Sequence, residues 1–300
     1  MAMENPPDDF WVKKRQFTRT VYRDVYSAID PTDPSNSQAG KIIVITGASK
    51  GLGRKAFVHS FAKANPKAIV IVARSSSALE EVRDEIHAIN KDIQVLIVPT
   101  DLLIAESIAA MWAKVKETYG HADVLISNAG TCQTGPISDI PVEKWWINFE
   151  TNVRAAFLLT QGFAELLGKE RKGSIVNIVS AAAVVVFPGM SSYSMSKLAA
   201  IQLQACIAIE YPNITAIALH PGIVVTDMTL DYFIPFAKDT PALVGGVGVW
   251  LSTEKSSFLS GKYIESNWSV DELSERQNEI IQQGKLFVGL KGEFGSEQFA

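Results

Sequence analysis

The chain has 300 residues, a formal net charge of −4 and a pI near 5.7. This acidic balance excludes the basic surface by which proteins bind nucleic acids, and the length suits one large domain with a sizeable core. The two cysteines, Cys132 and Cys206, form no C-x-x-C motif. We therefore expect neither a disulfide scaffold nor a metal site, in a protein of the reducing cytoplasm.

No segment has the pattern of a secretory signal or a membrane span. The opening residues, MAMENPPDDF, are acidic and rich in proline instead of basic and then apolar. The longest apolar run, residues 175–190, contains Asn177, Ser180 and Pro188 and is too short to cross a bilayer. The sequence thus predicts no membrane partner.

Residues 1–39 form an N-terminal arm that is more polar than the rest of the chain. Within it Phe17, Val21 and Val25 stand at i, i+4 and i+8, which predicts a short amphipathic helix. Aromatic residues such as Phe17 and Tyr26 are suited to pack on the rest of the chain or across a dimer. The alternative is a loosely attached, disordered extension.

From Lys41 onward, short apolar runs alternate with segments of helical periodicity. Strands are predicted at residues 41–46, 68–73, 94–99, 124–127, 175–179, 215–219 and 262–265. Helices are predicted at about residues 52–64, 77–89, 105–119, 143–168 and 192–210. Nearly continuous Val/Ile strands between helices indicate a parallel sheet covered on both faces. The fold class is α/β, a doubly wound Rossmann-type sheet of about seven strands over residues 40–268, with a helical tail at 269–300.

The first predicted strand leads directly into TGASKGLGRKAF, with glycines at positions 47, 51 and 53. Glycine permits a tight turn and lets the backbone approach a pyrophosphate, and the N-terminus of the next helix offers free N–H groups. Many loops are rich in glycine, but this one stands between a strand and a helix, as a dinucleotide-binding turn requires. It predicts a dinucleotide cofactor.

The second predicted strand ends in Arg74 and not in an acidic residue. An Asp or Glu there would bind the ribose 2′-hydroxyl, whereas Arg74 would attract a 2′-phosphate. Lys50 in the glycine turn adds a second cation. The alternative is that both are solvated surface charges. The pattern favours NADP(H) over NAD(H).

Tyr193 and Lys197 stand four residues apart in a predicted helix and therefore share one helix face. An ammonium group beside the phenol would lower the pKa of Tyr193 from its usual value of about 10. Such a tyrosine can exchange a proton with an alcohol or a carbonyl near neutral pH. The same spacing also occurs by chance on helix surfaces, so its interpretation depends on neighbours such as Ser180.

Over residues 40–268 the chain resembles the short-chain dehydrogenase/reductase family. It carries, in order, the T-G-x-x-x-G-x-G turn, an Asp-Leu pair, an N-A-G turn, a helix asparagine, the Ser/Tyr/Lys set and a P-G-x-x-x-T segment. The resemblance implies cofactor contacts from Thr46, Gly47, Ser49, Lys50, Gly51, Leu52, Gly53, Arg74, Asp101, Leu102, Asn128, Ala129, Gly130, Tyr193, Lys197, Pro221, Gly222, Ile223 and Thr226. The flanking segments resemble those of fungal reductases, some of which serve specialised metabolism.

The resemblance also implies a reaction, hydride transfer between a nicotinamide and a carbonyl or secondary alcohol. It assigns the acid/base role to Tyr193 and the lowering of its pKa to Lys197. Ser180 would stabilise the substrate oxygen, and Asn152 would hold a water that links Lys197 to solvent. We expect an NADP(H)-dependent enzyme for a small-molecule carbonyl or alcohol, assembled as a homodimer or homotetramer.

The substrate side of the sequence is less specific. Loops at 131–137, 181–190 and 226–238 are rich in apolar residues, which suggests a hydrophobic ketone. Two rival functions use the same scaffold: a non-redox cyclase or dehydratase, and a regulatory protein that senses NADP(H). Redox chemistry is favoured because all four catalytic positions are filled. Cys132, just past the N-A-G turn, is expected to pack as a small buried hydrophobe, the alternative being that it lines the pocket. His220 is expected to have a structural role.

Overall fold

The computed structural model describes residues 6–292, 294–295 and 298. The first five residues of the predicted arm and five positions of the predicted tail lie outside the described residues. Seven parallel strands form one sheet in the order β3-β2-β1-β4-β5-β6-β7. The strands are β1 (Ile42–Thr46), β2 (Ala68–Ala73), β3 (Gln94–Pro99), β4 (Val124–Ser127), β5 (Gly173–Ile178), β6 (Ile214–His220) and β7 (Tyr263–Glu265). The predicted doubly wound Rossmann-type fold is confirmed, and every strand begins and ends within two residues of its predicted position.

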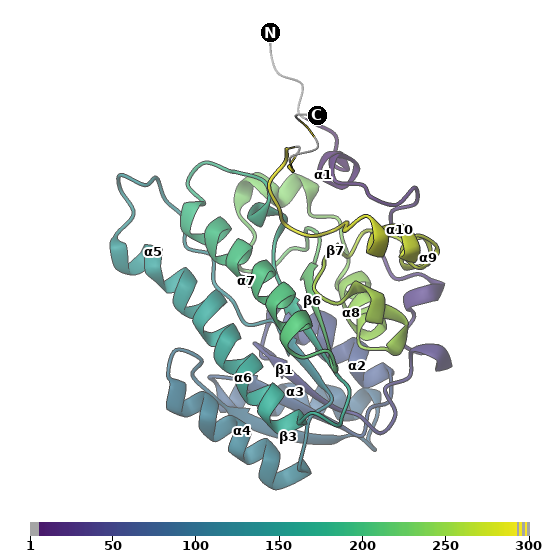
Figure 1. Ribbon diagram of the computed structural model, residues 1–300. Coiled ribbons are helices and arrows are strands. Elements are labelled where there is room, and N and C mark those ends of the chain that lie inside the picture. The colour runs from purple at the N-terminus through teal and green to yellow at the C-terminus, as the bar shows by residue number, and fades with distance from the viewer. Residues whose placement is uncertain (1–5, 293, 296–297, 299–300) are drawn as a thin grey trace.

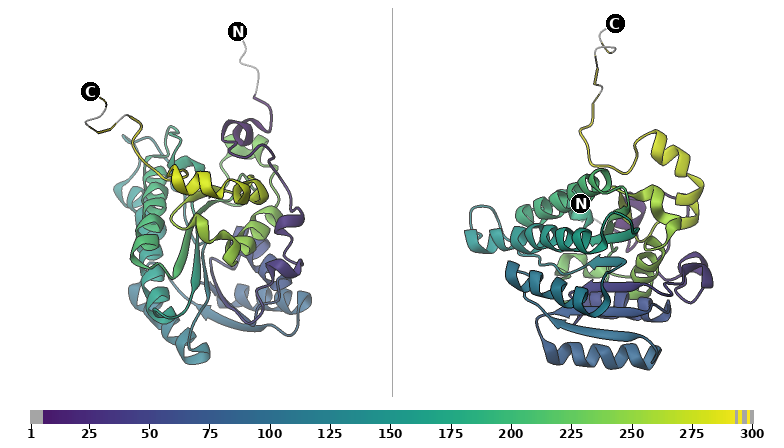
Figure 2. Two further views of the ribbon diagram at one scale, coloured as in Figure 1. Left: turned by 45° about the vertical axis from the view of Figure 1, so that its right-hand side comes forward. Right: turned by 60° about the horizontal axis from the view of Figure 1, so that its bottom comes forward.

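Helices cover both faces of the sheet (Figures 1 and 2). The α-helices are α1 (Phe10–Lys14), α2 (His59–Lys63), α3 (Ser76–Ile89), α4 (Ala105–Tyr119), α5 (Val142–Phe149), α6 (Ala155–Leu167), α7 (Ser191–Glu210), α8 (Pro241–Leu251), α9 (Val270–Glu275) and α10 (Gln277–Gln282). The 3-10 helices are η1 (Ser27–Ile29), η2 (Pro34–Asn36), η5 (Ala181–Ala183), η6 (Asp231–Phe236) and η7 (Glu254–Leu259). In the described part of the chain, no helix combines the length and the apolar character needed to cross a membrane.

The alternation of side chains along each strand divides the core into two layers. Ile43 and Ile45 of β1 pack in one apolar cluster with α2, α3 and α8. Ile42 and Val44 pack in the other cluster with α4 and α6. Successive residues of a strand point to opposite faces, so a strand covered by helices on both sides is apolar throughout. This explains why the Val/Ile runs predict the sheet so closely.

Two predicted helices contain a π-helical turn. The helix predicted at 52–64 begins as π-helix η3 (Gly53–Val58) and continues as α2. The helix predicted at 143–168 is divided into α5 and α6 by π-helix η4 (Glu150–Arg154). Such turns are frequent at functional sites, and η3 and η4 contain two predicted site residues, Gly53 and Asn152. The apolar periodicity does not reveal them, because one wider turn barely alters it.

The helix predicted at residues 17–25 of the arm is wrong. This segment is irregular, with bends at residues 18–20 and 23–24, and Val21 forms an antiparallel bridge with Trp268. The N–H of Tyr22 donates to the carbonyl of Asn267 at 2.8 Å. These backbone groups bind the core and are not available for a helix. The described part of the arm therefore lies along the body of the protein, beside α8 and α9 (Figure 2).

Helix α8 has no counterpart among the predicted elements. Every residue from Leu243 to Leu251 is buried, so the segment lacks the polar face that gives a helix its sequence signature. Thr240 caps it by accepting from the N–H of Leu243 at 3.1 Å. A Cβ at Gly246 would lie only 2.6 Å from the carbonyl oxygen of Ile29, so the arm approaches α8 where glycine leaves space.

Candidate active site

A cavity of about 690 Å³ opens where the strands end. Each strand or the turn after it supplies lining residues, among them Gly47, Arg74, Thr100, Asn128, Ile178, His220 and Glu265. We call the part lined within residues 49–52, 73–75 and 100–103 the cofactor end. The part lined within residues 11–15, 185–190 and 228–233 is called the substrate end. The carboxyl edge of an open parallel sheet is the usual ligand site of this fold class.

The glycine turn after β1 is shaped by close backbone contacts. A Cβ at Gly53 would lie 2.0 Å from the carbonyl oxygen of Gly47, so no larger residue fits without moving the turn. The hydroxyl of Thr46 accepts from the N–H groups of Asn128 and Ala129 at 3.0 and 3.1 Å. Asn128 Nδ2 donates to the carbonyl of Thr46 at 2.8 Å. The two turns thus form one cradle that fits a dinucleotide pyrophosphate.

The far side of the cofactor end carries the predicted adenine and phosphate contacts. Asp101 Oδ1 accepts from the N–H of Leu103 at 3.0 Å, which fixes the loop after β3. Arg74 is exposed on the cavity wall. Lys50 Nζ lies 2.7 Å from Asp227 Oδ2, and both side chains are more than 70% exposed. An ion pair so exposed contributes little, so Lys50 is free to turn toward an anionic ligand.

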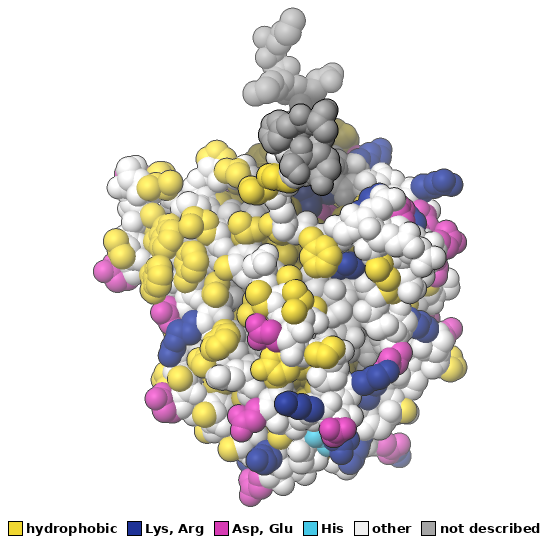
Figure 3. Space-filling model, in the orientation of Figure 1, with side chains coloured by type: hydrophobic (Ala, Val, Ile, Leu, Met, Phe, Trp, Pro, Cys, Tyr) yellow, Lys and Arg dark blue, Asp and Glu magenta, His cyan; other side chains and the backbone are white. Residues whose placement is uncertain are grey.

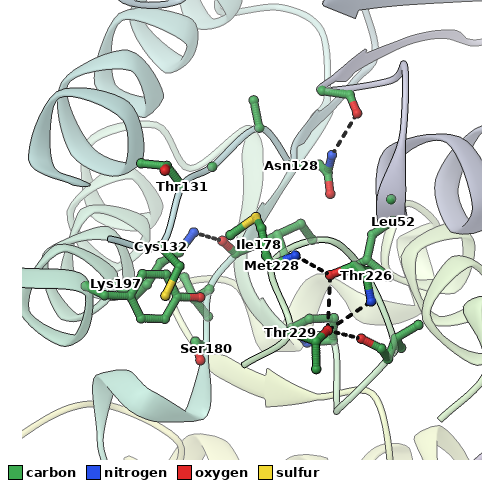
Figure 4. A pocket seen from close by; sticks show the side chains of 18 of the residues that line it. Leu52, Asn128, Thr131, Cys132, Ile178, Ser180, Lys197, Thr226, Met228 and Thr229 are labelled. Atoms are coloured by element: carbon green, nitrogen blue, oxygen red, sulfur yellow. Dashed lines mark hydrogen bonds between the residues drawn. The ribbon is translucent and has the colours of Figure 1, made fainter. Parts of the chain in front are cut away.

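Ser180, Tyr193 and Lys197 all line the middle of the cavity. Ser180 follows β5, and its hydroxyl accepts from the N–H of Ala182 at 3.2 Å. Tyr193 and Lys197 lie one turn apart on α7, with Lys197 Nζ 5.9 Å from the centroid of the phenol ring. The ammonium group donates to the carbonyl of Ile178 at 2.7 Å (Figure 4). The helix register therefore brings phenol and ammonium to one wall, as predicted from their spacing.

The predicted lowering of the Tyr193 pKa is wrong for this structure. Burial raises the pKa of Tyr193; the nearby Cys132 adds to this, and hydrogen bonding to Ser180 acts in the opposite direction. Burial lowers the pKa of Lys197 from 10.5 to about 8. Removal from water is the largest effect on the pKa of Tyr193, and the Nζ of Lys197 donates to a backbone carbonyl. Tyr193 therefore carries its proton at neutral pH.

Asn152 in η4 ties the loop after β4 to α7. Its Oδ1 accepts from the N–H of Thr131 at 3.1 Å, and its Nδ2 donates to Thr131 O and Ser196 Oγ, both at 3.0 Å. A Cβ at Gly130 would lie 3.0 Å from Asn152 Oδ1 and 3.3 Å from Lys197 Nζ, so these three residues are neighbours. The amide is engaged within the protein, and the water-holding role of Asn152 stays a prediction.

The Pro-Gly segment after β6 is fixed by a buried carboxylate. The N–H of Ile223 donates to Asp239 Oδ2 at 2.6 Å. Further along, the N–H of Thr226 donates to Thr229 Oγ1 at 2.9 Å, and Thr226 Oγ1 accepts from the N–H of Met228 at 3.2 Å (Figure 4). This closed turn holds the predicted nicotinamide contacts of residues 221–226 against the cavity.

His220 lies directly before this segment and also lines the cavity. Its Nδ1 accepts from the N–H of Ala181 at 3.2 Å, which leaves the ring proton on Nε2. Burial, together with the guanidinium group of Arg15, lowers the pKa of His220 to about 3. The imidazole is therefore neutral at physiological pH, and His220 is not suited to donate a proton as an imidazolium ion.

The cavity wall contains most of the predicted site residues. Those that line it are Gly47, Ser49, Lys50, Gly51, Leu52, Arg74, Asp101, Leu102, Asn128, Ala129, Gly130, Ser180, Tyr193, Lys197, Pro221, Gly222, Ile223 and Thr226. Thr46, Gly53 and Asn152 lie behind the wall, buried, where they hold the lining segments in place.

Cys132 lines the wall, which is the alternative to the packing role expected for it, and burial raises the pKa of its thiol to about 11. Several other cavity residues are not anticipated by the sequence. Trp11 and Arg15 reach the cavity from the arm, and no pattern in the sequence connects them with it. Glu265 at the carboxyl end of β7 could be found from its position, because charged residues at such strand ends face the ligand site.

Comparison with known proteins places these features in a family. Residues 41–233 match the profile of the family described as short chain dehydrogenase. The short chain dehydrogenase citE of Monascus ruber is 35% identical over 294 residues, which cover 93% of this chain and 96% of that protein. The short chain dehydrogenase andI of Emericella variicolor is 33% identical over 288 residues, 92% of this chain and 97% of the relative.

Solved structures share the fold at lower identity. The L-sorbose reductase from Gluconobacter frateurii, complexed with NADPH and L-sorbose, superposes with a TM-score of 0.70 and 26% identity, covering 77% of this chain and 96% of that chain. A short-chain type dehydrogenase/reductase from Mycobacterium marinum gives a TM-score of 0.70 at 26% identity, with 80% of this chain and 97% of that chain covered.

Proposed function

The chain belongs to the short-chain dehydrogenase/reductase family, and on that premise we propose that it is an NADP(H)-dependent oxidoreductase that reduces a ketone to a secondary alcohol. The observation that carries the proposal is a single cavity that contains both a glycine turn suited to a dinucleotide and a set of side chains suited to proton transfer. At one end is a glycine turn too tight for any side chain at Gly53. In its middle Ser180, Tyr193 and Lys197 line the same wall. A cofactor whose pyrophosphate is held at this turn would supply the hydride from its nicotinamide.

Tyr193 is the proton donor of the proposed reaction. It delivers its phenolic proton to the substrate oxygen as negative charge develops there, while Ser180 donates a hydrogen bond to the same oxygen. Burial raises the pKa of Tyr193, so at neutral pH the phenol carries the proton that the proposed reduction consumes. The positive charge of Lys197 on the same wall then stabilises the phenolate left behind.

The preference for NADP(H) rests on two cations at the cofactor end. Arg74 is exposed on the cavity wall where β2 ends, and Lys50 lies on the glycine turn in a weak, solvent-exposed pair with Asp227. Neither position carries the acidic side chain that would bind a ribose 2′-hydroxyl and repel a 2′-phosphate. The relative from Gluconobacter frateurii, which was solved with NADPH, supports the same choice.

The proposed substrate is a hydrophobic small molecule. At the substrate end, Val185, Phe187, Leu230 and Phe233 line the wall, so apolar contacts dominate there. A pocket of this kind binds mainly by removing apolar surface from water, and a few polar groups fix the orientation of the ligand.

NADPH oxidation, followed by absorbance with a panel of aliphatic and aromatic ketones, tests the proposal. We expect turnover with ketones and a loss of about 10²–10⁴-fold in kcat for Tyr193→Phe, with NADPH binding retained. Binding of NADPH without turnover of any ketone would instead favour the two rival functions, a non-redox enzyme on the same scaffold or an NADP(H) sensor. Full activity in Tyr193→Phe would overturn the assignment of the proton donor.

We further propose a homodimer or homotetramer that buries the outer face of α5, α6 and α7. Hydrophobic side chains gather over α5 and α6 in Figure 3. Trp146 and Phe157 are 51% and 48% exposed, and they line a shallow apolar groove with Phe149, Val153 and Leu203. Contiguous exposed apolar surface of this kind marks an interaction site. Light scattering on the purified full chain measures the assembly, and a monomeric mass would overturn this point.

A further inference from the structure

Helix α1 of the arm forms part of the substrate end. Trp11, Val12 and Arg15 line the cavity although they lie far in sequence from the other lining residues. The Trp11 ring packs edge-on against Phe187, with ring centroids 5.3 Å apart, and against Phe233 at 6.5 Å. Phe187 belongs to the loop between β5 and α7, and Phe233 to η6. One arm residue therefore joins the two loops that border the substrate end.

Arg15 attaches this helix to the central sheet. Its Nε donates to Glu265, which is 3% exposed at the end of β7, and its Nη2 donates to the hydroxyl of Tyr263 at 3.4 Å. The carbonyl of Arg15 accepts from Trp268 Nε1 at 3.0 Å. The side chain of Arg15 keeps 20% of its surface exposed, and Arg15 lines the cavity.

A second contact of the arm supports the loop beside the nicotinamide site. Arg23 Nε lies 2.7 Å from Asp239 Oδ1, and its Nη2 donates to the carbonyl of Phe236 at 2.7 Å. The other oxygen of Asp239 accepts from the N–H of Ile223. The side chain of Asp239 is wholly buried, and leaving a buried carboxylate without its cation would strongly destabilise the folded protein. The arm thus holds the substrate wall in a fixed position.

Two donors of the arm have no partner within the described part of the chain. Trp11 Nε1 is buried without a hydrogen bond, and Arg15 uses Nε and Nη2 but not Nη1. The buried Trp11 donor is out of reach of a ligand, whereas the Arg15 side chain is 20% exposed and lines the cavity, so its Nη1 can donate to an acceptor on a ligand bound there. Glu265 already balances the charge of Arg15, which favours a neutral carbonyl or hydroxyl oxygen over a carboxylate.

We propose that α1 of the arm is the distal wall of the substrate pocket and that Trp11 and Arg15 determine specificity. The substrate class is an aromatic ketone with a second, neutral oxygen on its ring system. The ring lies against Trp11, Phe187 and Phe233, and the second oxygen accepts from Arg15. This inference rests on the proposed ketone reduction for its turnover assays and is independent of it for its binding assays.

The first experiment compares Trp11→Ala with Trp11→Phe and a matched control, Phe17→Ala. Phe17 lies in the same arm but packs on Trp268 and beneath Arg276, away from the cavity. The ratio of kcat/KM for acetylnaphthalene to that for cyclohexanone should fall about tenfold in Trp11→Ala, mainly through KM, and recover in Trp11→Phe. Phe17→Ala should lower the melting temperature and leave the ratio unchanged. An unchanged ratio in Trp11→Ala would overturn the proposal.

The second experiment tests Arg15 without leaving Glu265 as an unpaired buried charge. The double variant Arg15→Gln/Glu265→Gln keeps a polar pair and removes both charges. Wild type should prefer para-hydroxyacetophenone to acetophenone in kcat/KM, and the double variant should lose most of this preference, a change of about fivefold. Equal preference in both proteins would show that Arg15 does not contact the second oxygen.

A binding measurement separates this inference from the proposed function. Acedan, a dimethylamino naphthyl ketone, emits at shorter wavelength in apolar surroundings, so its fluorescence reports binding without turnover. Acedan should bind wild type and Phe17→Ala alike and Trp11→Ala about tenfold more weakly. If acedan binds in this way but no ketone supports NADPH oxidation, the proposed ketone reduction is overturned and the proposal that α1 forms the distal wall of the pocket is supported. Equal acedan affinity in all three proteins, or no binding to wild type, would overturn the proposal that α1 forms the distal wall, even if ketones are reduced.

Discussion

The two ends of the cavity are built in different ways. At the cofactor end, the glycine turn that directly follows β1 is built from close backbone contacts and is joined to the turn after β4 through Thr46 and Asn128. The substrate end is assembled from side chains of distant segments, with Trp11 of the arm between Phe187 and Phe233. A site made of close backbone contacts tolerates no added atoms. A site made of side-chain packing can change its shape through single substitutions, so cofactor use and substrate range can change independently.

Adding one methyl group to the glycine turn gives the strongest test of this contrast. In Gly53→Ala the new Cβ would lie 2.0 Å from the carbonyl oxygen of Gly47. Overpacking of about 1–3 kcal/mol at this turn corresponds to roughly 5- to 150-fold weaker NADPH binding. Acedan affinity should stay within about twofold, because its site is remote from the turn. Calorimetric titration with NADPH measures the first effect and acedan fluorescence the second.

The control is Gly289→Ala, where a Cβ meets nothing within 4 Å. It should bind NADPH like wild type. If Gly53→Ala weakened both ligands equally, the two ends would form one cooperative unit and the contrast between them would fail.

Lys197 lies where the two ends meet, and its charge links stability to pH. Burial lowers the pKa of Lys197 from 10.5 to about 8, so between these values the unfolded state binds more protons than the folded state. The free energy of unfolding must rise with pH across this window. Relative to Lys197→Met, wild type should gain about 2 kcal/mol between about pH 7 and about pH 10.

Urea denaturation at a series of pH values measures this gain. The exposed Lys169 provides the matched control, and Lys169→Met should run parallel to wild type at every pH. A parallel curve for Lys197→Met would mean that Lys197 titrates normally in the folded protein.

Arg74 tests whether the cofactor end distinguishes the 2′-phosphate. Arg74→Ala removes an exposed guanidinium group from the cavity wall, and losing one charge-assisted hydrogen bond should raise the KM for NADPH about tenfold. The KM for NADH should not change. Steady-state rates with both cofactors measure the effect, and Arg171→Ala, at an exposed position outside the cavity lining, is the control. An equal change for NADPH and NADH would place Arg74 against a group that both cofactors share.

The contrast between the ends also explains what the sequence could predict. Glycine positions, the Val/Ile strands and the Tyr193–Lys197 spacing follow local rules, so the sheet, the glycine turn after β1 and the shared wall of Tyr193 and Lys197 could be predicted from the sequence. The place of Trp11 depends on Arg15 and Arg23 binding carboxylates more than 200 residues away, and no local pattern reports such a contact. The expected lowering of the Tyr193 pKa is wrong because residue spacing shows a nearby ammonium group but not the extent of burial.

Cys132 should give the smallest effect, although it lies on the cavity wall near Lys197. Burial raises the pKa of its thiol to about 11, against a weaker opposing effect of Lys197, so at neutral pH almost none of it is thiolate. Only the thiolate reacts with iodoacetamide. Mass spectrometry should therefore find the exposed Cys206 labelled and Cys132 nearly unlabelled, and Cys132→Ala should change kcat/KM by less than about twofold. Rapid labelling of Cys132 would mean that the ammonium group outweighs burial at this wall, and the same reasoning would then return the pKa of Tyr193 to the lowered value expected from its spacing.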